Sequence, residues 1–351
     1  MSISNSGSMA LTTKLKAMHG KRLRSQQYKE LLRRQSVTEI AAYLKQQPVY
    51  AQTLKDINEN SVHRGQLENV IRRQLYTDYM KMITYISEDE SRFYDFFLKR
   101  MEIDGILGCL RSLLTGGNGD NYLWKPDYFA KHASFKINDL ANVGSFDELR
   151  ELLGKTPYST LLSQFDPKSA DKTDAIMIEN RFYSYYFSEI FSIIDSNFSG
   201  ETKDAISGSF GVDVDMMNIT EIIRLKKYYD VKSSMIRPLQ LPHYYLIKKA
   251  EIARMIDAPD SSAAMQALMQ TAYGKYFGKS GNKDYIEGSA KQIGYDYNKK
   301  LLAFTLDAPV AVVAYLQLKE LEIKNVVSII EGVRYGLSPA EISKVIVDTG
   351  D

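Results

Sequence analysis

Cysteine is nearly absent from this chain of 351 residues, in which Cys109 is the only one. A single thiol excludes an intramolecular disulfide and a thiolate zinc cluster, and it suits a reducing compartment. Net charge is also nearly absent, since 45 Lys and Arg against 43 Asp and Glu leave +2. Such a balanced chain has no global field for binding nucleic acid or an acidic membrane. The start of the chain is small and polar, whereas a secretory signal has an apolar core.

Long apolar runs are missing too. The best candidate for a membrane span, residues 301–318, contains Asp307, Pro309 and Gln317, so we expect a buried helix of a soluble protein there. Proline is scarce, with nine residues, and apolar residues recur at helical spacing along most of the chain. Alternating strand patterns are few and short. The sequence therefore predicts an all-α protein.

Three patterns recur with a period of about 110 residues, which is too long for a solenoid of helical pairs. The first pattern is a helix-capping residue, a leucine eight residues later, and a tyrosine five or six residues after the leucine. Its copies are Ser36, Leu44 and Tyr50; Ser145, Leu153 and Tyr158; and Asp260, Leu268 and Tyr273. Glu39 and Glu148, three residues after the two serines, predict capping boxes.

The second pattern is an acidic residue near the start of a long helix, with tyrosines following it, at Glu68, Glu179 and Glu287. The third pattern is an acid, then Asn or Gly three residues later, then an apolar residue, and a charged residue six beyond the Asn or Gly. Its polar members are Glu102 and Arg111; Asp215, Asn218 and Arg224; and Glu322, Asn325 and Glu331, with Arg334 three residues further on. All three patterns keep the same order along the chain.

The polar members of the third pattern are candidate site residues that we interpret as structural. They recur in every copy, whereas an active site usually occurs once. The set is Glu102, Arg111, Asp215, Asn218, Arg224, Glu322, Asn325 and Arg334. We expect each acid to form a polar network with the arginine of its own copy.

These repeats predict three similar helical units, at residues 10–120, 121–235 and 236–351, after a flexible N-terminus at 1–9. Turn-forming residues mark joints at 115–126 and 230–242, with shorter loops at 166–174 and 278–284. Near the end of the chain, Gly336 predicts a helix stop, and Ser338 followed by Pro339 predicts a capped new helix.

Catalytic patterns are weak. His19, His63, His132 and His243 share no i, i+3 or i+4 spacing, so no helical pair of zinc ligands exists. Residues 274–280 resemble a phosphate-binding loop, but one residue too few separates the two glycines and no strand is predicted before them. We interpret this segment as a solvated loop. A nucleotide-dependent enzyme centred on Lys279 stays open as an alternative.

The first hundred residues are locally basic, with Lys21, Arg22 and Arg24 near several tyrosines. This composition leaves an RNA-binding helical protein as another alternative. We favour an amphipathic helix whose basic residues face water.

Two stretches carry a family resemblance. Residues 321–339 (LEIKNVVSIIEGVRYGLSP), together with the triple repeat, resemble the C-terminal signature of the central-stalk C subunit of the V-type/A-type ATPase (ATP synthase), a family that includes the d subunit of the eukaryotic V-ATPase (AC39-like). Residues 11–23 (LTTKLKAMHGKRL) resemble the N-terminal helix of that protein. The resemblance extends over nearly the whole chain, from about residue 10 to about residue 345.

The resemblance implies three all-α units arranged with pseudo-threefold symmetry as a funnel. It implies a non-catalytic rotor adaptor without a cofactor, which joins the central shaft subunits to the membrane rotor ring (proteolipid) subunits and transmits torque for ion transport or ATP synthesis. It places the protein at the cytoplasmic face of the membrane, attached through protein contacts, with no nucleic-acid partner. The main alternative is a three-repeat helical scaffold that docks other proteins.

Overall fold

The fold was analysed on a computed structural model, which describes residues 5–86, 88–115, 126–163, 165, 172–229, 231–279, 286–347 and 349–350. Every regular element within these ranges is a helix, which confirms the predicted all-α class. The turn-rich segments predicted at 115–126, 166–174 and 278–284 fall largely outside the described residues.

The chain divides into two compact units, each built from separate stretches of sequence. Unit 1 combines Met1–Ser87, Phe198–Ser233 and His243–Asp351, and unit 2 combines Glu88–Asn197 and Ser234–Pro242. The boundaries predicted after residues 120 and 235 mark repeats of sequence rather than these packing units, and they stay a prediction. The helix α1 already begins at Asn5, within the stretch predicted to be flexible.

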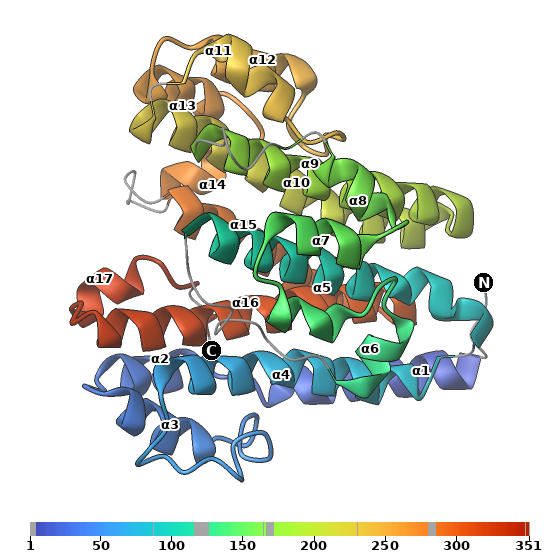
Figure 1. The fold of residues 1–351 in the computed structure, drawn as a ribbon, viewed down its shortest axis with the longest axis vertical. Helices are drawn as coiled ribbons and strands as arrows, with labels where there is room; N and C mark the ends of the chain where they lie inside the picture. The colour runs from blue at the N-terminus through green and yellow to red at the C-terminus, as the bar shows by residue number, and fades with distance from the viewer. Residues whose placement is uncertain are drawn as a thin grey trace. The chain divides into compact units, whose positions relative to one another are not determined.

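Unit 1 is organised around one long helix, α16. Its helices are α1 (Asn5–Gly20), α2 (Ser25–Leu32), α3 (Val37–Lys45), α4 (Arg64–Ile83), α10 (Gly200–Tyr228), α12 (Lys249–Asp257), α13 (Ser261–Met269), α14 (Gly274–Lys279), α15 (Ile286–Phe304), α16 (Ala308–Arg334) and α17 (Pro339–Ser343). The helix α16 packs against α15, α4, α1 and α10 (Figure 1). Its consecutive residues from Val310 to Leu316 are all buried, as expected for a helix surrounded by others.

Unit 2 contains two long helices with shorter ones around them. Its elements are α5 (Glu88–Thr115), α6 (Asp127–His132), η1 (Ile137–Asn142), α7 (Phe146–Leu153), α8 (Pro157–Leu162), α9 (Lys172–Asn197) and η2 (Arg237–Leu239), with α11 (Ser233–Ile236) at its border. The helix α5 packs against α9, and α8 packs against α9 as well. Tyr158 of α8 stacks on Phe182 of α9 with ring centroids 5.9 Å apart, so aromatic packing joins the two helices.

Residues 301–318 do not form the single buried helix that was expected. The helix α15 ends at Phe304 and α16 begins at Ala308, with Pro309 in the first turn of α16, where its missing N–H has no consequence. In the connection, the Asp307 amide donates a hydrogen bond to Thr305 Oγ1 (3.0 Å). Among the described residues, no helix combines the length and the apolarity that crossing a bilayer requires.

The predicted helix caps form, with one difference. The Ser36 and Ser145 hydroxyls accept the amides of Glu39 (3.1 Å) and Glu148 (3.2 Å), which fixes the starts of α3 and α7. The two glutamates reach back to the amide one residue before the serine, at Gln35 and Gly144, rather than to the serine itself. In the third copy, the Asp260 carboxylate accepts the Ala263 amide (2.8 Å) at the start of α13.

The predicted stop and restart near the end of the chain are confirmed. Gly336 has a φ of 70°, and the Leu337 amide donates to the Gly332 carbonyl (2.9 Å), which closes α16 with a Schellman motif. The Ser338 hydroxyl then accepts the Glu341 amide, and the Glu341 carboxylate accepts the Ser338 amide. This reciprocal capping box starts α17.

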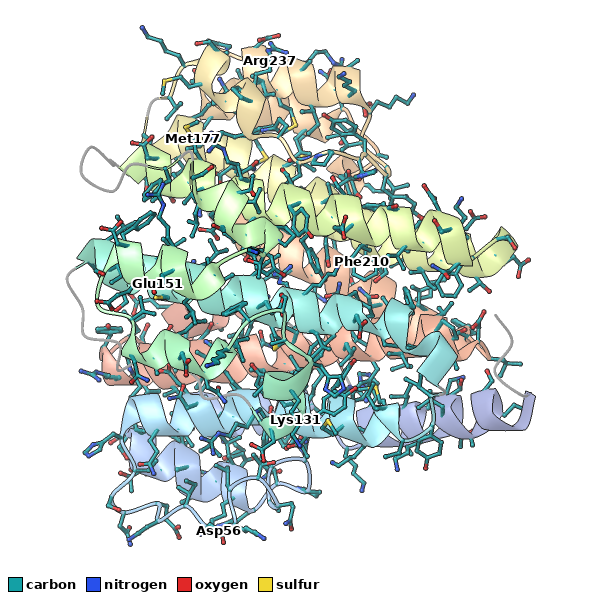
Figure 2. All side chains as sticks on the ribbon, turned by 45° about the vertical axis from the view of Figure 1, so that its right-hand side comes forward. Asp56, Lys131, Glu151, Met177, Phe210 and Arg237 are labelled. Carbon is teal, nitrogen blue, oxygen red and sulfur yellow. The ribbon has the colours of Figure 1, made fainter. Side chains whose placement is uncertain are left out.

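The helix α10 runs through the interior of unit 1, where its Phe210 is buried, whereas Asp56 lies at the surface of the same unit (Figure 2). Two glycines of α10 let neighbouring side chains come close to its backbone. A Cβ at Gly211 would lie 2.6 Å from the Tyr245 Cβ, and a Cβ at Gly208 would overlap the Tyr297 hydroxyl. Only glycine lets this face of α10 come so near to the two tyrosines. The two tyrosine hydroxyls lie 3.2 Å apart, within hydrogen-bond distance.

We expect Gly211→Ala to lower the free energy of unfolding by about 1–3 kcal/mol, because the new methyl overlaps a Cβ that cannot rotate away. Gly65→Ala in α4 is the matched control, since nothing lies within 4 Å of its Cβ. This control should leave stability unchanged or raise it by up to about 1 kcal/mol. Urea unfolding of both variants checks the prediction, and an unchanged midpoint for Gly211→Ala would contradict the close packing.

Candidate functional site

The three acids of the third sequence pattern are buried on the long helices. Glu102 lies on α5, Asp215 on α10 and Glu322 on α16, and none is more than 5% exposed. Each accepts a hydrogen bond from a buried tyrosine hydroxyl. The pairs are Tyr158 with Glu102 (2.5 Å), Tyr273 with Asp215 (2.8 Å) and Tyr50 with Glu322 (3.0 Å). The structure thus joins the acid of the third pattern to the tyrosine that ends the first.

Each acid also accepts backbone amides from the segment that precedes the capped helix. Glu102 accepts the amide (2.5 Å) and the hydroxyl (2.8 Å) of Ser134. Asp215 accepts three consecutive amides, those of Tyr245 (3.1 Å), Leu246 (2.8 Å) and Ile247 (3.2 Å). Glu322 accepts the Leu23 amide (3.0 Å). One carboxylate therefore holds both ends of a region of short helices against its long helix.

The pairing always reaches into the next copy of the repeat. Glu102 and Asp215 bind tyrosines that follow them by 56 and 58 residues. Glu322 binds Tyr50, which is 272 residues away near the start of the chain. The N-terminal short helices therefore pack on the last long helix and close the series.

Ionisation states fit these contacts. Burial raises the pKa of Tyr50, Tyr158 and Tyr273, and the negative charge of the neighbouring carboxylate raises it further. Each hydroxyl therefore stays protonated and donates its hydrogen to the acid. Burial also raises the pKa of Asp215, while the three backbone amides and the Tyr273 hydroxyl oppose the rise.

The arginines do not pair with these acids as expected. Arg111 lies 3.6 Å from Glu179, and Arg224 lies 2.6 Å from Glu221, all measured between charged atoms. Arg334 is exposed, and its charge acts on Glu68 of α4. Burial raises the pKa of the Glu68 carboxyl, and the positive charge of Arg334 is one of those that oppose this rise. An arginine nine residues along the helix from a buried acid lies more than two turns away, so the tyrosines take its place.

The two asparagines of the pattern are buried. Asn325 of α16 binds Val347 in both directions, accepting its amide (2.8 Å) and donating to its carbonyl (2.9 Å). This pair ties the C-terminal segment to α16. Asn218 lies in α10 with 1% of its surface exposed.

Glu322 is the centre of a larger buried cluster in unit 1. Lys319, one turn before it, lies 2.5 Å from its carboxylate, and both side chains are almost fully buried. The Lys319 ammonium also lies 4.8 Å from the centre of the Tyr50 ring, a cation–π contact. Tyr50 thus meets Glu322 with its hydroxyl and Lys319 with its ring face.

A cavity of about 10 Å³ adjoins this cluster, lined among others by His19, Arg22, Tyr295, Lys319 and Glu322. That volume corresponds to roughly one water molecule and is far too small for a nucleotide. Burial, followed by the positive charges of Arg22, Lys299 and Lys319, lowers the pKa of His19 to about 4. His19 is therefore neutral at physiological pH.

Other candidates for chemistry are dispersed. Burial raises the pKa of the Cys109 thiol to about 11, which keeps it protonated and unreactive. Residues 274–279 form the short helix α14 rather than a phosphate-binding loop, and a Cβ at Gly274 would overlap the Met269 carbonyl oxygen. Ser280 lies outside the described residues. In the ranges that the structure describes, no three His, Cys, Asp or Glu side chains gather as a metal site would need.

Sequence reasoning found the acids and the tyrosines but not their pairing. The usable signal was that a carboxylate on an apolar helix face needs donors once it is buried. A tyrosine hydroxyl at a repeated position supplies one. The backbone amides at residues 23, 134 and 245–247 carry no sequence signal, because every non-proline residue has one.

Comparisons with known proteins match nearly the whole chain to one family. Residues 11–345 match the protein family described as ATP synthase (C/AC39) subunit. The C subunit of the A-type ATP synthase of Methanosarcina mazei is 24% identical over 243 residues, which is 69% of this chain and 65% of that protein, less than two thirds of its length. The corresponding protein of Pyrococcus abyssi is 20% identical over 95% of this chain and 88% of its own. That of Archaeoglobus fulgidus is 21% identical over 96% and 95%.

Removing the hydroxyl from Tyr50 tests the buried pairs. We expect Tyr50→Phe to lower the free energy of unfolding by about 1.5–3 kcal/mol, because the buried Glu322 carboxylate loses a donor. The exposed Tyr85, whose hydroxyl meets Lys14 at 3.2 Å, is the matched control, and Tyr85→Phe should cost less than about 0.5 kcal/mol. Equal urea midpoints for the two variants would contradict a structural role for the Tyr50 hydroxyl.

Stability should also depend on pH through His19. Because the folded pKa of about 4 lies below the ordinary value of 6.5, the unfolded chain binds the proton more readily between these values. Stability therefore falls as pH decreases from about 6.5 to about 4, by up to about 3 kcal/mol. The difference in unfolding free energy between the natural chain and His19→Gln, measured from pH 7.5 to 4.5, should follow this fall. A difference that is constant across the range would contradict it.

Proposed function

The chain belongs to the ATP synthase (C/AC39) subunit family, and we propose that it is a non-catalytic rotor adaptor of a V/A-type rotary ATPase. In this role it joins the central shaft subunits to the membrane rotor ring and transmits torque between them, for ion transport or for ATP synthesis. It acts within a membrane-associated complex, at the cytoplasmic face, through protein contacts.

The single observation that carries this proposal is the series of buried acid–tyrosine pairs. Three long helices each hold, through one carboxylate, the short helices of the next repeat, and the third link returns to the start of the chain. A series that closes on itself supports three similar units around a pseudo-threefold axis, arranged as a funnel. We retain 10–120, 121–235 and 236–351 as the extents of these units.

A closed series suits a part that transmits torque. An open row of units can splay at its free end, whereas a closed one resists twisting at every joint. The joints are buried and hydrogen-bonded to a charged group, and breaking such a contact costs several kcal/mol. These features support a stiff helical body between a shaft and a ring.

The state of the polar groups supports a non-catalytic role. Glu102, Asp215 and Glu322 each accept two or more hydrogen bonds from the protein itself. A general acid or base must instead reach the substrate with a free lone pair or proton. The recurring acids are therefore engaged in holding the fold.

Binding to a rotor ring is the experiment that tests the function. We expect the purified chain to co-sediment with a rotor ring of the same source, reconstituted in nanodiscs, at one chain per ring, and to bind more tightly when the shaft subunits are present. Failure to bind a competent ring and shaft would overturn the adaptor proposal and leave the three-repeat helical scaffold with other protein partners.

A further inference from the structure

Several helix ends of unit 1 meet at one place. Hydrogen bonds there join α1, from Ser8 to Lys16, with the end of α4, the end of α15 and the start of α16, and they join the start of α10 with the connection between α15 and α16. These bonds are Ala308 N to Ser8 Oγ (3.3 Å), Lys16 Nζ to the Ala303 carbonyl (3.1 Å), Lys14 Nζ to the Tyr85 hydroxyl (3.2 Å), and Thr202 Oγ1 to the Asp307 carboxylate. In Figure 1 the marked N-terminus lies at this end, where α1 begins beside the end of α4.

Large apolar side chains project from this end. Phe304 is 79% exposed, Leu306 75% and Met9 63%, and Tyr85 is 37% exposed. We call these four residues the apolar end of unit 1. Single exposed apolar residues are ordinary, but a group on adjoining helix ends marks a surface that another molecule covers. Covering side chains of this size removes apolar surface from water and so favours binding.

Positive charge accompanies the apolar end. Lys14 and Lys16 lie on α1, five and seven residues after Met9. Lys300 lies one helical turn before Phe304, on the same face of α15. Among the side chains that the structure describes, which leave out those of residues 87–92, no carboxylate lies within ion-pair distance of these lysines. The Asp307 carboxylate at this end accepts a hydrogen bond from Thr202 Oγ1. Lysines without a carboxylate partner favour a bound molecule with negative groups at the edge of its contact.

We propose that the apolar end of unit 1 is the surface that seats on the membrane rotor ring. Met9, Phe304 and Leu306 enter apolar recesses between ring subunits, and Lys14, Lys16 and Lys300 face carboxylates or phosphates at the border. This assignment rests on the proposed adaptor function and goes beyond it by naming the residues that make the contact.

The ring fits this surface better than the shaft or the lipid does. A membrane-embedded ring presents apolar side chains up to the level of the lipid headgroups, whereas a shaft is surrounded by water. Lysines at the border of the contact are also attracted to the anionic surface of the membrane that surrounds the ring. Lipid alone is fluid and cannot pass torque to a protein, while side chains seated in protein recesses can.

The decisive variant is Phe304→Asp with Leu306→Asp, which places charge where the apolar contact is expected. Both side chains are exposed, so the fold should persist, and an unchanged urea midpoint verifies this. The matched control is Tyr335→Asp, because Tyr335 is 69% exposed and follows α16 at its other end, about 40 Å from the apolar end along the helix.

Binding is measured to the rotor ring in nanodiscs, to the purified shaft subunits and to protein-free vesicles that contain anionic lipid. We expect the double variant to lose about tenfold or more in affinity for the ring and to keep its affinity for the shaft, while Tyr335→Asp keeps both. Lys14→Glu with Lys16→Glu should weaken ring binding about fivefold at low salt and less at high salt.

The outcomes separate this assignment from the function on which it rests. Absence of ring binding by the natural chain would overturn the adaptor function itself. Ring binding by the natural chain that survives in the double variant would overturn only the assigned surface. If the double variant lost shaft binding but kept ring binding, the assigned surface would also be overturned. The same holds if the natural chain bound the protein-free vesicles as tightly as it binds the ring.

Discussion

A carboxylate buried in a helical core must receive hydrogen bonds, because leaving it without donors costs several kcal/mol. In this protein that requirement is met in the same way at Glu102, Asp215 and Glu322. A tyrosine hydroxyl from one side and backbone amides from the other converge on each acid. The carboxylate is thereby a specific joint, since few other arrangements of the short helices would satisfy it.

The third joint differs from the others in what it connects. Glu322 joins residues near the two ends of the chain, and Lys319 adds a buried ion pair beside it. The C-terminal segment packs onto the same helix through Asn325 and Val347. The long helix α16 is therefore the element on which the beginning and the end of the chain both depend, which agrees with the burial of all its residues from Val310 to Leu316.

The chain belongs to the ATP synthase (C/AC39) subunit family, and the adaptor role that we propose for it would give these joints a mechanical meaning. A protein between a shaft and a ring must resist deformation more than it must react. Buried, hydrogen-bonded charges serve specificity and stiffness when they are fully satisfied. The apolar end of unit 1 is chemically the opposite kind of feature, because its large apolar side chains are exposed to solvent.

Much of the architecture could be predicted from sequence. Helical periodicity and scarce proline predict the all-α class. The cap residues Ser36, Ser145 and Asp260 mark the starts of α3, α7 and α13, and they could be recognised because capping is a local interaction. The stop at Gly336 is local as well. Other predictions were incomplete: residues 301–318 contain a break between two helices, and the acids of the third pattern bind tyrosines rather than arginines.

The sequence by itself determined the helices, their caps and the repeated positions of acid and tyrosine, since these depend on spacing along the chain. Only the tertiary structure decided which acid meets which tyrosine, and that Tyr50 closes on Glu322 across 272 residues. It also decided that Met9, Tyr85, Phe304 and Leu306 lie at adjoining helix ends. Local interactions act between neighbours in sequence, whereas burial and packing join residues whose order in the chain says nothing of their distance in space.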